Sequence, residues 1–218
     1  MRVVWDEANG DGMALQVHVL PVGLLEVNCH LAWDPDTGRG VVIDPGDDAA
    51  DLVAAVTAAG FTPVAVLLTH GHVDHIRAVG DIGKRYGIPV FIARADRDLY
   101  FSPANALPPW MPAAPNLPEP VHVLPDCGGL DFRVLPSPGH TPGSVCFHLP
   151  SAGVLFSGDT LFRAGVGRTD LPGGSLEDLE RSLRSVLYVL PDETRVYPGH
   201  GAPTTIGTEK RANPFVRP

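Results

Sequence analysis

The sequence predicts an α/β fold in which two β-rich halves, each followed by helix, pack sheet on sheet beneath covering helices. With 218 residues, the chain has the length of one mid-sized domain and is too short for two ordinary ones. Apolar residues make up 44% and charged residues 19%, values that are typical of a folded globular protein. We therefore expect residues 1–218 to form a single domain.

The first half begins with three short strands, and two helices then alternate with a buried strand. The buried strand is PVAVLLTH, a continuous apolar run of suitable length. The helix before it begins at acidic residues and ends at Gly60. The next helix begins at Asp74 and ends near Gly87. The expected strands are 13–20, 29–33, 39–46, 63–70 and 89–92, and the expected helices are 47–59, 74–87 and 94–100.

A proline-rich segment, residues 102–120, separates the halves and predicts a surface loop, because proline breaks helix interiors and central strands. Within it we expect Trp110 and Met111 to pack in the loop rather than cover a site. Ser175 and Asp178 resemble a capping arrangement at the start of a helix that runs to about 190. The remaining expected elements are strands near 121–125, 130–135, 144–149 and 153–157, the glycine-rich loop LFRAGVGRTDLPGG, and a last strand in RVYPGHG.

The bulk composition excludes several kinds of partner. A net charge of -9 and a pI near 5.3 do not provide the clustered cations that nucleic acid requires. Three cysteines, Cys29, Cys127 and Cys146, lack C-x-x-C spacing, which argues against a disulfide framework and a thiolate zinc site. The N-terminus does not resemble a signal peptide, and no apolar run approaches the roughly 20 residues that span a bilayer. We expect a cytoplasmic protein with a small-molecule substrate and neither a nucleic-acid nor a membrane partner.

Histidine and aspartate concentrate where predicted strands end. The motif THGHVDH has four ligand-type residues within six positions, and three more follow other strands at glycine-rich turns. A single such histidine or aspartate is typically a surface, core or turn residue, but these explanations do not account for all seven together. Imidazole and carboxylate bind zinc, iron or manganese, and loops at strand ends can hold them in place. The candidate metal ligands are His70, His72, Asp74, His75, His140, Asp159 and His200.

The other histidines match no ligand motif, and we expect them to be structural or on the surface. They are His18, His30, His122 and His148.

The motifs THGHVDH, PGHTPGS, SGDTLF, GVGRTD and YPGHG, in this order, resemble those of the metallo-β-lactamase superfamily and, within it, of the short bacterial branch of glyoxalase II-like hydrolases. The resemblance implies a four-layer αβ/βα sandwich that binds two divalent metal ions, with zinc expected and iron or manganese as alternatives. It implies that one ion is held by His70, His72 and His140, the second by Asp74, His75 and His200, and that Asp159 bridges them.

The same resemblance implies hydrolysis of a hydroxyacyl thioester such as S-lactoylglutathione by a hydroxide that bridges the metal ions. Two divalent ions lower the pKa of a shared water toward about 7 and polarise the attacked carbonyl. The leaving thiolate needs little acid assistance because a thiol pKa is about 8.5. Asp74 is the candidate proton shuttle, and Arg168 is expected to contact an anionic thiol-bearing substrate.

Two other interpretations stay open. The GRTD loop also occurs in persulfide dioxygenase-like relatives, which use one iron at positions matching His70, His140 and Asp159. Such relatives also retain second-site residues, so the second ligand set does not exclude this reaction. The other interpretation is a protein that binds metal but has lost its enzymatic activity. Asp170 replaces an aromatic residue of the long glyoxalase II enzymes, and this chain has TIGTEKRANPFVRP where those enzymes have a helical domain. The sequence therefore leaves the thiol and the acyl group open, as well as the oligomeric state.

Overall fold

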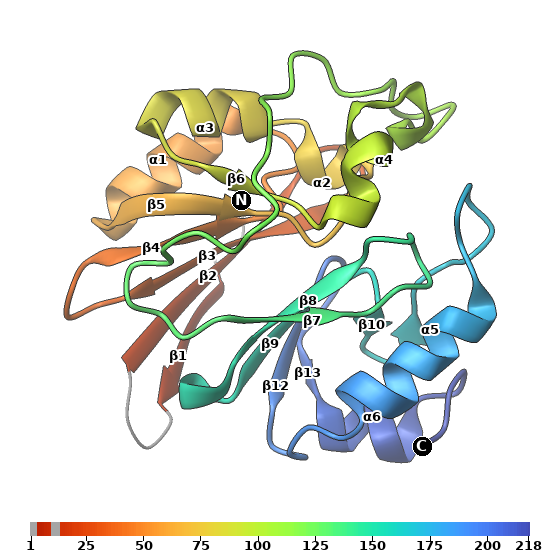
Figure 1. Ribbon diagram of the computed structural model, residues 1–218. Helices are drawn as coiled ribbons and strands as arrows, with labels where there is room; N and C mark the ends of the chain where they lie inside the picture. Colours follow the sequence, from red (N-terminus) through yellow and green to blue (C-terminus); the bar gives the residue numbers. More distant parts are fainter. Residues whose placement is uncertain (1–3, 10–13) are drawn as a thin grey trace.

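Two β-sheets pack face to face, and helices lie on their outer sides, in a computed structural model that describes residues 4–9 and 14–218 (Figure 1). Helices α1 and α3 cover the first sheet, and α5 and α6 cover the second. This is the predicted four-layer αβ/βα sandwich. No helix in these two ranges combines the length and the apolarity that crossing a membrane requires.

The first sheet contains six strands in sequence order, antiparallel up to β4 and parallel from β4 to β6. Its strands are β1 (Val4–Asn9), β2 (Ala14–Val22), β3 (Val27–Asp34), β4 (Arg39–Ile43), β5 (Thr62–Leu67) and β6 (Val90–Phe91). The helices of this half are α1 (Ala49–Ala59), α2 (Val73–Ile76), α3 (Val79–Tyr86) and α4 (Arg97–Phe101), with 3-10 turns at Arg94–Asp96 and Pro103–Asn105.

The second sheet has the order β13-β12-β9-β8-β7, and a separate hairpin, β10–β11, follows β9 in the chain. Its strands are β7 (Arg133–Pro136), β8 (Val145–Leu149), β9 (Val154–Gly158), β12 (Arg195–Pro198) and β13 (Thr204–Thr205). The hairpin strands are β10 (Leu161–Phe162) and β11 (Gly165–Val166). The remaining helical segments are a 3-10 turn at Pro150–Ala152, α5 (Leu176–Ser182), a π-helical turn at Leu183–Leu187 and α6 (Ile206–Ala212).

Side chains alternate between two cores along each strand, as the two-residue period of a strand requires. On β9, Val154 and Phe156 belong to the core between the sheets, whereas Leu155 packs with Leu179 and Ile206 beneath the helices. Because both faces are buried, such strands are continuous apolar runs in the sequence, which is why β5 could be predicted from PVAVLLTH.

Several predicted boundaries are wrong. The helix expected from Asp74 to Gly87 is two helices, α2 and α3, because the N–H of Ala78 donates to the carbonyl of Pro45 (3.0 Å) and leaves the helical pattern. The strand expected at 121–125 is absent from the described chain, where only Val121 forms a bridge, to Phe91. Proline stands at both ends of this segment, which limits further pairing.

The second half contains further corrections. The strand expected from 130 begins only at Arg133, the glycine-rich loop contains the β10–β11 hairpin, and the helix expected to reach 190 ends at Leu187. The segment expected as helix 94–100 begins as a 3-10 turn. β1 and α6 were not predicted, and Met13, the first residue of the strand expected at 13–20, lies outside the described residues. In the proline-rich loop Met111 is buried, while 58% of Trp110 is exposed.

Candidate metal centre

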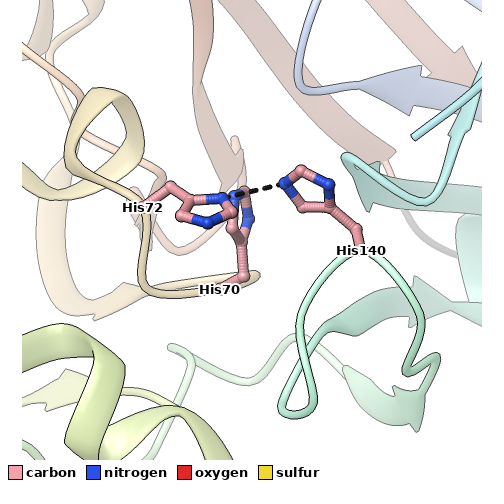
Figure 2. Close-up of side chains that lie close together, drawn as sticks. All are labelled: His70, His72 and His140. Atoms are coloured by element: carbon pink, nitrogen blue, oxygen red, sulfur yellow. Dashed lines mark hydrogen bonds between the residues drawn. The ribbon is translucent and has the colours of Figure 1, made fainter. Parts of the chain in front are cut away.

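The structure brings all seven candidate ligands to one place at the ends of strands from both sheets. The first half contributes the loop after β5 and helix α2, and the second half contributes the β7–β8 loop and the turns after β9 and β12. Figure 2 shows His70 and His72 from the first half facing His140 from the second. His72 Nδ1 and His140 Nε2 are 2.9 Å apart.

The ligand atoms form three groups, in each of which all atoms lie within 4.8 Å of one another. Two of these groups are the sets that the family resemblance implies for the two ions. The groups are His70, His72 and His140; Asp74, His75 and His200; and His70, His75 and Asp159.

Asp159 lies between the first two groups. Its Oδ1 is 3.4 Å from His75 Nε2, and its Oδ2 is 3.7 Å from the Nε2 atoms of both His140 and His200. One carboxylate thus faces histidines of both sets, which is the placement expected of a bridging ligand.

Hydrogen bonds at the back of the imidazoles orient three of the rings. Nδ1 of His140 donates to the carbonyl of Arg168 (2.8 Å), and Nδ1 of His200 donates to the carbonyl of Leu25 (3.1 Å). Nδ1 of His75 donates to Asp44 Oδ2 (3.0 Å). Since these acceptors hold a proton on Nδ1, Nε2 is the atom of each ring that can bind a metal ion.

Asp44 was not predicted as a site residue. Besides His75, it accepts hydrogen bonds from Thr69, from the backbone N–H at Oδ1 (2.8 Å) and from the hydroxyl at Oδ2 (2.6 Å). It is buried, and its φ is +50°, a left-handed value that aspartate tolerates better than most residues. A signal was present, because Asp44 precedes Pro-Gly after an apolar strand, the same form as the turns that carry the predicted ligands.

Gly199 lets the backbone approach the centre closely. A Cβ at this position would lie 2.3 Å from Asp159 Oδ1 and 2.8 Å from His75 Cε1. Any larger residue would displace the carboxylate or the imidazole, which explains why glycine precedes His200 in the motif YPGHG.

The donor atoms fit a divalent metal ion. Among the described residues, three buried atoms of the centre have no hydrogen-bond partner: His70 Nε2, His75 Nε2 and Asp159 Oδ1. A buried polar atom without a partner is unfavourable, and these three belong to one group of atoms within 4.8 Å. Nitrogen and carboxylate oxygen donors are those that bind zinc, iron and manganese.

The two histidine sets differ in electrostatic environment. Burial, and next the neighbouring histidines, hold the pKa of His70 well below its ordinary value, and burial and His140 lower that of His72 to about 4. Burial also lowers the pKa of His75, but the carboxylates of Asp159, Asp74 and Asp44 outweigh burial and hold it well above the ordinary value. His70 and His72 are therefore neutral imidazoles, whereas His75 lies among three carboxylates.

A cavity of about 270 Å³ opens onto the centre. Its wall contains three leucines, Leu25, Leu107 and Leu171, in addition to ligands and Arg168. Leu107 belongs to the proline-rich loop, so this loop contributes to the site through a residue that the sequence analysis did not select.

Arg168 lies at the cavity, but its guanidinium is paired. Nε and one terminal nitrogen donate to the two carboxylate oxygens of Asp170, both at 2.7 Å, and about half of the Arg168 side chain is exposed. Arg163, in the same loop, is exposed and does not line this cavity. Of the four histidines expected to be structural or on the surface, three are buried and His122 is half-buried.

Comparison with known proteins gives one family. The family described as the metallo-β-lactamase superfamily matches residues 22–200. The hydroxyacylglutathione hydrolase GloC of Haemophilus influenzae is 35% identical over 213 residues, which cover 93% of this chain and 98% of GloC.

Three solved structures of differently named proteins are similar to this chain. The B3 metallo-β-lactamase BLEG-1 is 37% identical, with a TM-score of 0.81 over 91% of this chain and 98% of BLEG-1. TTHA1623 in a di-iron-bound form is 40% identical, with a TM-score of 0.77 over 91% of this chain and 99% of TTHA1623. ETHE1 from Myxococcus xanthus is 33% identical, with a TM-score of 0.74 over 92% of this chain and 84% of ETHE1.

Proposed function

The chain belongs to the metallo-β-lactamase superfamily, a family of metal-dependent hydrolases, and we propose that it hydrolyses a hydroxyacyl thioester with two divalent metal ions bound. The observation that carries the proposal is the second ligand set, Asp74, His75 and His200, gathered beside the first. Two ligand sets side by side provide places for two ions, which supports the two-ion reaction.

The proposed ligands of the first ion are His70, His72 and His140, those of the second are Asp74, His75 and His200, and Asp159 faces both. Two bound divalent cations would lower the pKa of water and stabilise the negative charge that develops on an attacked carbonyl oxygen. Zinc is the expected metal, and iron and manganese suit the same donors.

The protein's own residues orient the substrate and handle the proton. Asp74 Oδ2 lies 3.3 Å from His200 Nε2 and 3.7 Å from His75 Nε2, so its carboxylate stands at the centre, where an attacking water loses a proton. A thiolate leaves without full protonation because a thiol pKa is about 8.5, so a thioester needs no separate general acid.

The cavity favours a short acyl group. Its volume of about 270 Å³ is slightly below the range of about 300–1,000 Å³ for ligand pockets, and its three leucines provide an apolar wall for a short acyl chain. Arg168 is the proposed contact for an anionic thiol carrier, with Asp170 competing for the same guanidinium. Glutathione is the proposed carrier by similarity to GloC.

Persulfide dioxygenation is the second candidate, favoured by the similarity to ETHE1 and by the GRTD sequence around Arg168. This reaction would use one iron near His70, His140 and Asp159.

Metal counting and two substrate assays distinguish the candidates. We expect the purified protein to contain two metal ions per chain and to release free thiol from S-lactoylglutathione without oxygen uptake. One ferrous ion per chain, with oxygen uptake on glutathione persulfide and no thioester turnover, would establish the dioxygenase instead. A third assay, with a chromogenic cephalosporin, tests for β-lactamase activity, because BLEG-1 is named as a B3 metallo-β-lactamase. Hydrolysis of the cephalosporin without hydrolysis of the thioester would also refute the proposal.

A further inference from the structure

We propose that Asp96 is a positioning residue that fixes the first ligand set, His70, His72 and His140, by fastening together the two loops that carry these histidines. The inference rests on the proposed metal centre. Asp96 is not a ligand in any of the three groups, and no motif of the sequence analysis includes it.

The Asp96 carboxylate is fully buried at the end of the 3-10 turn before α4. Its Oδ2 accepts hydrogen bonds from the Gly71 N–H (2.9 Å) and the Thr141 hydroxyl (2.8 Å), and its Oδ1 accepts one from the Gly143 N–H (2.7 Å). Gly71 lies between His70 and His72, and Thr141 directly follows His140. One carboxylate thus holds both loops.

The approach at Gly143 is closer than a side chain permits. A Cβ on this residue would lie 2.4 Å from the backbone nitrogen of Asp96 and 2.6 Å from its Oδ1. The loop that carries His140 is therefore packed directly on the Asp96 turn, so a shift of this turn would move the loop.

The two loops come from different sheets, and the first ligand set is complete only when they meet. The contact between His72 Nδ1 and His140 Nε2, at 2.9 Å (Figure 2), joins the same two loops that Asp96 connects through its hydrogen bonds. Hydrogen bonds behind metal ligands set the orientation of the ligands, and their loss commonly lowers metal affinity by about 10- to 100-fold.

Glu209 provides a matched control in the other half. It is buried, and it accepts hydrogen bonds from the Ala164 N–H (3.0 Å), the Asn213 amide (2.9 Å) and the Thr204 hydroxyl (2.6 Å). Ala164 lies in the β10–β11 turn and Thr204 follows the His200 turn, so Glu209 has no hydrogen bond to either loop of the first set. Like Asp96, it is a buried carboxylate with three donors.

The test is a calorimetric titration that measures the stepwise binding of Zn²⁺ to the metal-free protein. His72→Ala and His200→Ala each remove a ligand of only one set, and so identify which binding step belongs to which set. We expect Asp96→Asn to weaken the step of the first set by about 10- to 100-fold and the other step by less than about threefold. Glu209→Gln should leave the step of the first set unchanged.

A second variant keeps the test valid if Asp96→Asn does not fold, which circular dichroism would reveal. Thr141→Val preserves the shape of the side chain and removes one of the three donors, and we expect a loss of about 2- to 12-fold in the same step. An unchanged first-set step in the folded Asp96→Asn protein, or in Thr141→Val where Asp96→Asn is unfolded, would overturn the inference. Equal weakening of both steps would do so as well, because it would indicate a general structural role.

The wild-type result separates this inference from the proposed function. If the wild type binds one ion, the two-ion hydrolase fails. The role of Asp96 then holds only if His72→Ala abolishes that ion's binding and Asp96→Asn weakens it. If the wild type binds two ions and does not hydrolyse thioesters, the proposed reaction fails. The role of Asp96 is then decided by the Zn²⁺-binding steps of the Asp96→Asn protein alone.

Discussion

Replacing Asp44 by asparagine tests whether a carboxylate behind the ligands controls the second metal ion. In the structure Asp44 Oδ2 accepts from His75 Nδ1 and the Thr69 hydroxyl, and Oδ1 accepts from the Thr69 N–H. Asparagine has the same shape and tolerates the left-handed backbone at this position. The substitution therefore changes one oxygen into an NH₂ group and leaves the rest of the turn in place.

Both orientations of the new amide are unfavourable. With its oxygen toward His75, the NH₂ group faces the Thr69 N–H, so two donors meet. With the NH₂ group toward His75, Nδ1 becomes an acceptor and the proton moves to Nε2, the atom that would bind metal. A buried hydrogen bond to a charged group contributes about 1.5–3 kcal/mol, which corresponds to about 10- to 150-fold in affinity at 1.36 kcal/mol per tenfold.

We expect Asp44→Asn to lower the Zn²⁺ affinity of the set that contains Asp74, His75 and His200 by about 10- to 150-fold. Competition for Zn²⁺ with a chromophoric chelator measures this affinity. Asp48→Asn is the control, because Asp48 has the same φ of +50° and accepts a backbone hydrogen bond, from Gly23 (2.8 Å), but is exposed and is not among the candidate ligands. Wild-type affinity of the Asp44→Asn protein, or an equal loss in the control, would refute the reasoning.

Three further predictions follow from the site and the core. Asp159→Ala should remove activity and most bound metal, because this carboxylate faces both ligand sets, and a purified variant with two ions and normal turnover would contradict the assignment. Arg168→Ala should raise KM for an anionic thioester by about 3- to 10-fold with little change in kcat, since its guanidinium is exposed and shared with Asp170. An unchanged KM would show that Arg168 does not contact the substrate. Burial lowers the pKa of His30 from 6.5 to about 3, so the folded state binds its proton less readily than the unfolded state. The His30 contribution to stability is therefore complete above about pH 6.5 and is lost as the pH falls toward 3. Between pH 6.5 and 4.5 we expect metal-free wild type to lose about 2–3 kcal/mol more unfolding free energy than His30→Leu, as urea titrations would measure, and parallel pH profiles would exclude the shift.

The sequence was sufficient to select the seven residues that the structure brings together, because each occupies a short motif at the end of an apolar strand. His140, for example, is recognisable within PGHTPGS, although 65 residues separate it from His75. The same locality made the buried strands predictable, since a strand enclosed on both faces is a continuous apolar run.

Contacts between distant segments could not be predicted in this way. Asp96 and Glu209 lie outside the ligand motifs, and their partners are up to 47 residues away in the sequence. The break between α2 and α3 likewise depends on the carbonyl of Pro45, more than 30 residues before Ala78. The Pro45 carbonyl lies outside residues 74–87, so the helical pattern within these residues predicts one continuous helix.

The arrangement of the ligands links metal binding to the packing of the two sheets. Each of the first two sets takes two residues from the loop and helix after β5 and one histidine from the second half, His140 in one set and His200 in the other. Neither half of the chain can therefore complete either set alone. Because ligand binding to the folded state alone stabilises that state, an ion bound by such a set stabilises the face-to-face packing of the sheets as well as its own coordination. The buried carboxylates Asp44 and Asp96 have the complementary role, since each holds segments that carry ligands without entering a ligand set. The geometry of the centre thus depends on the sheets being packed correctly, and their packing is in turn reinforced when the centre is filled.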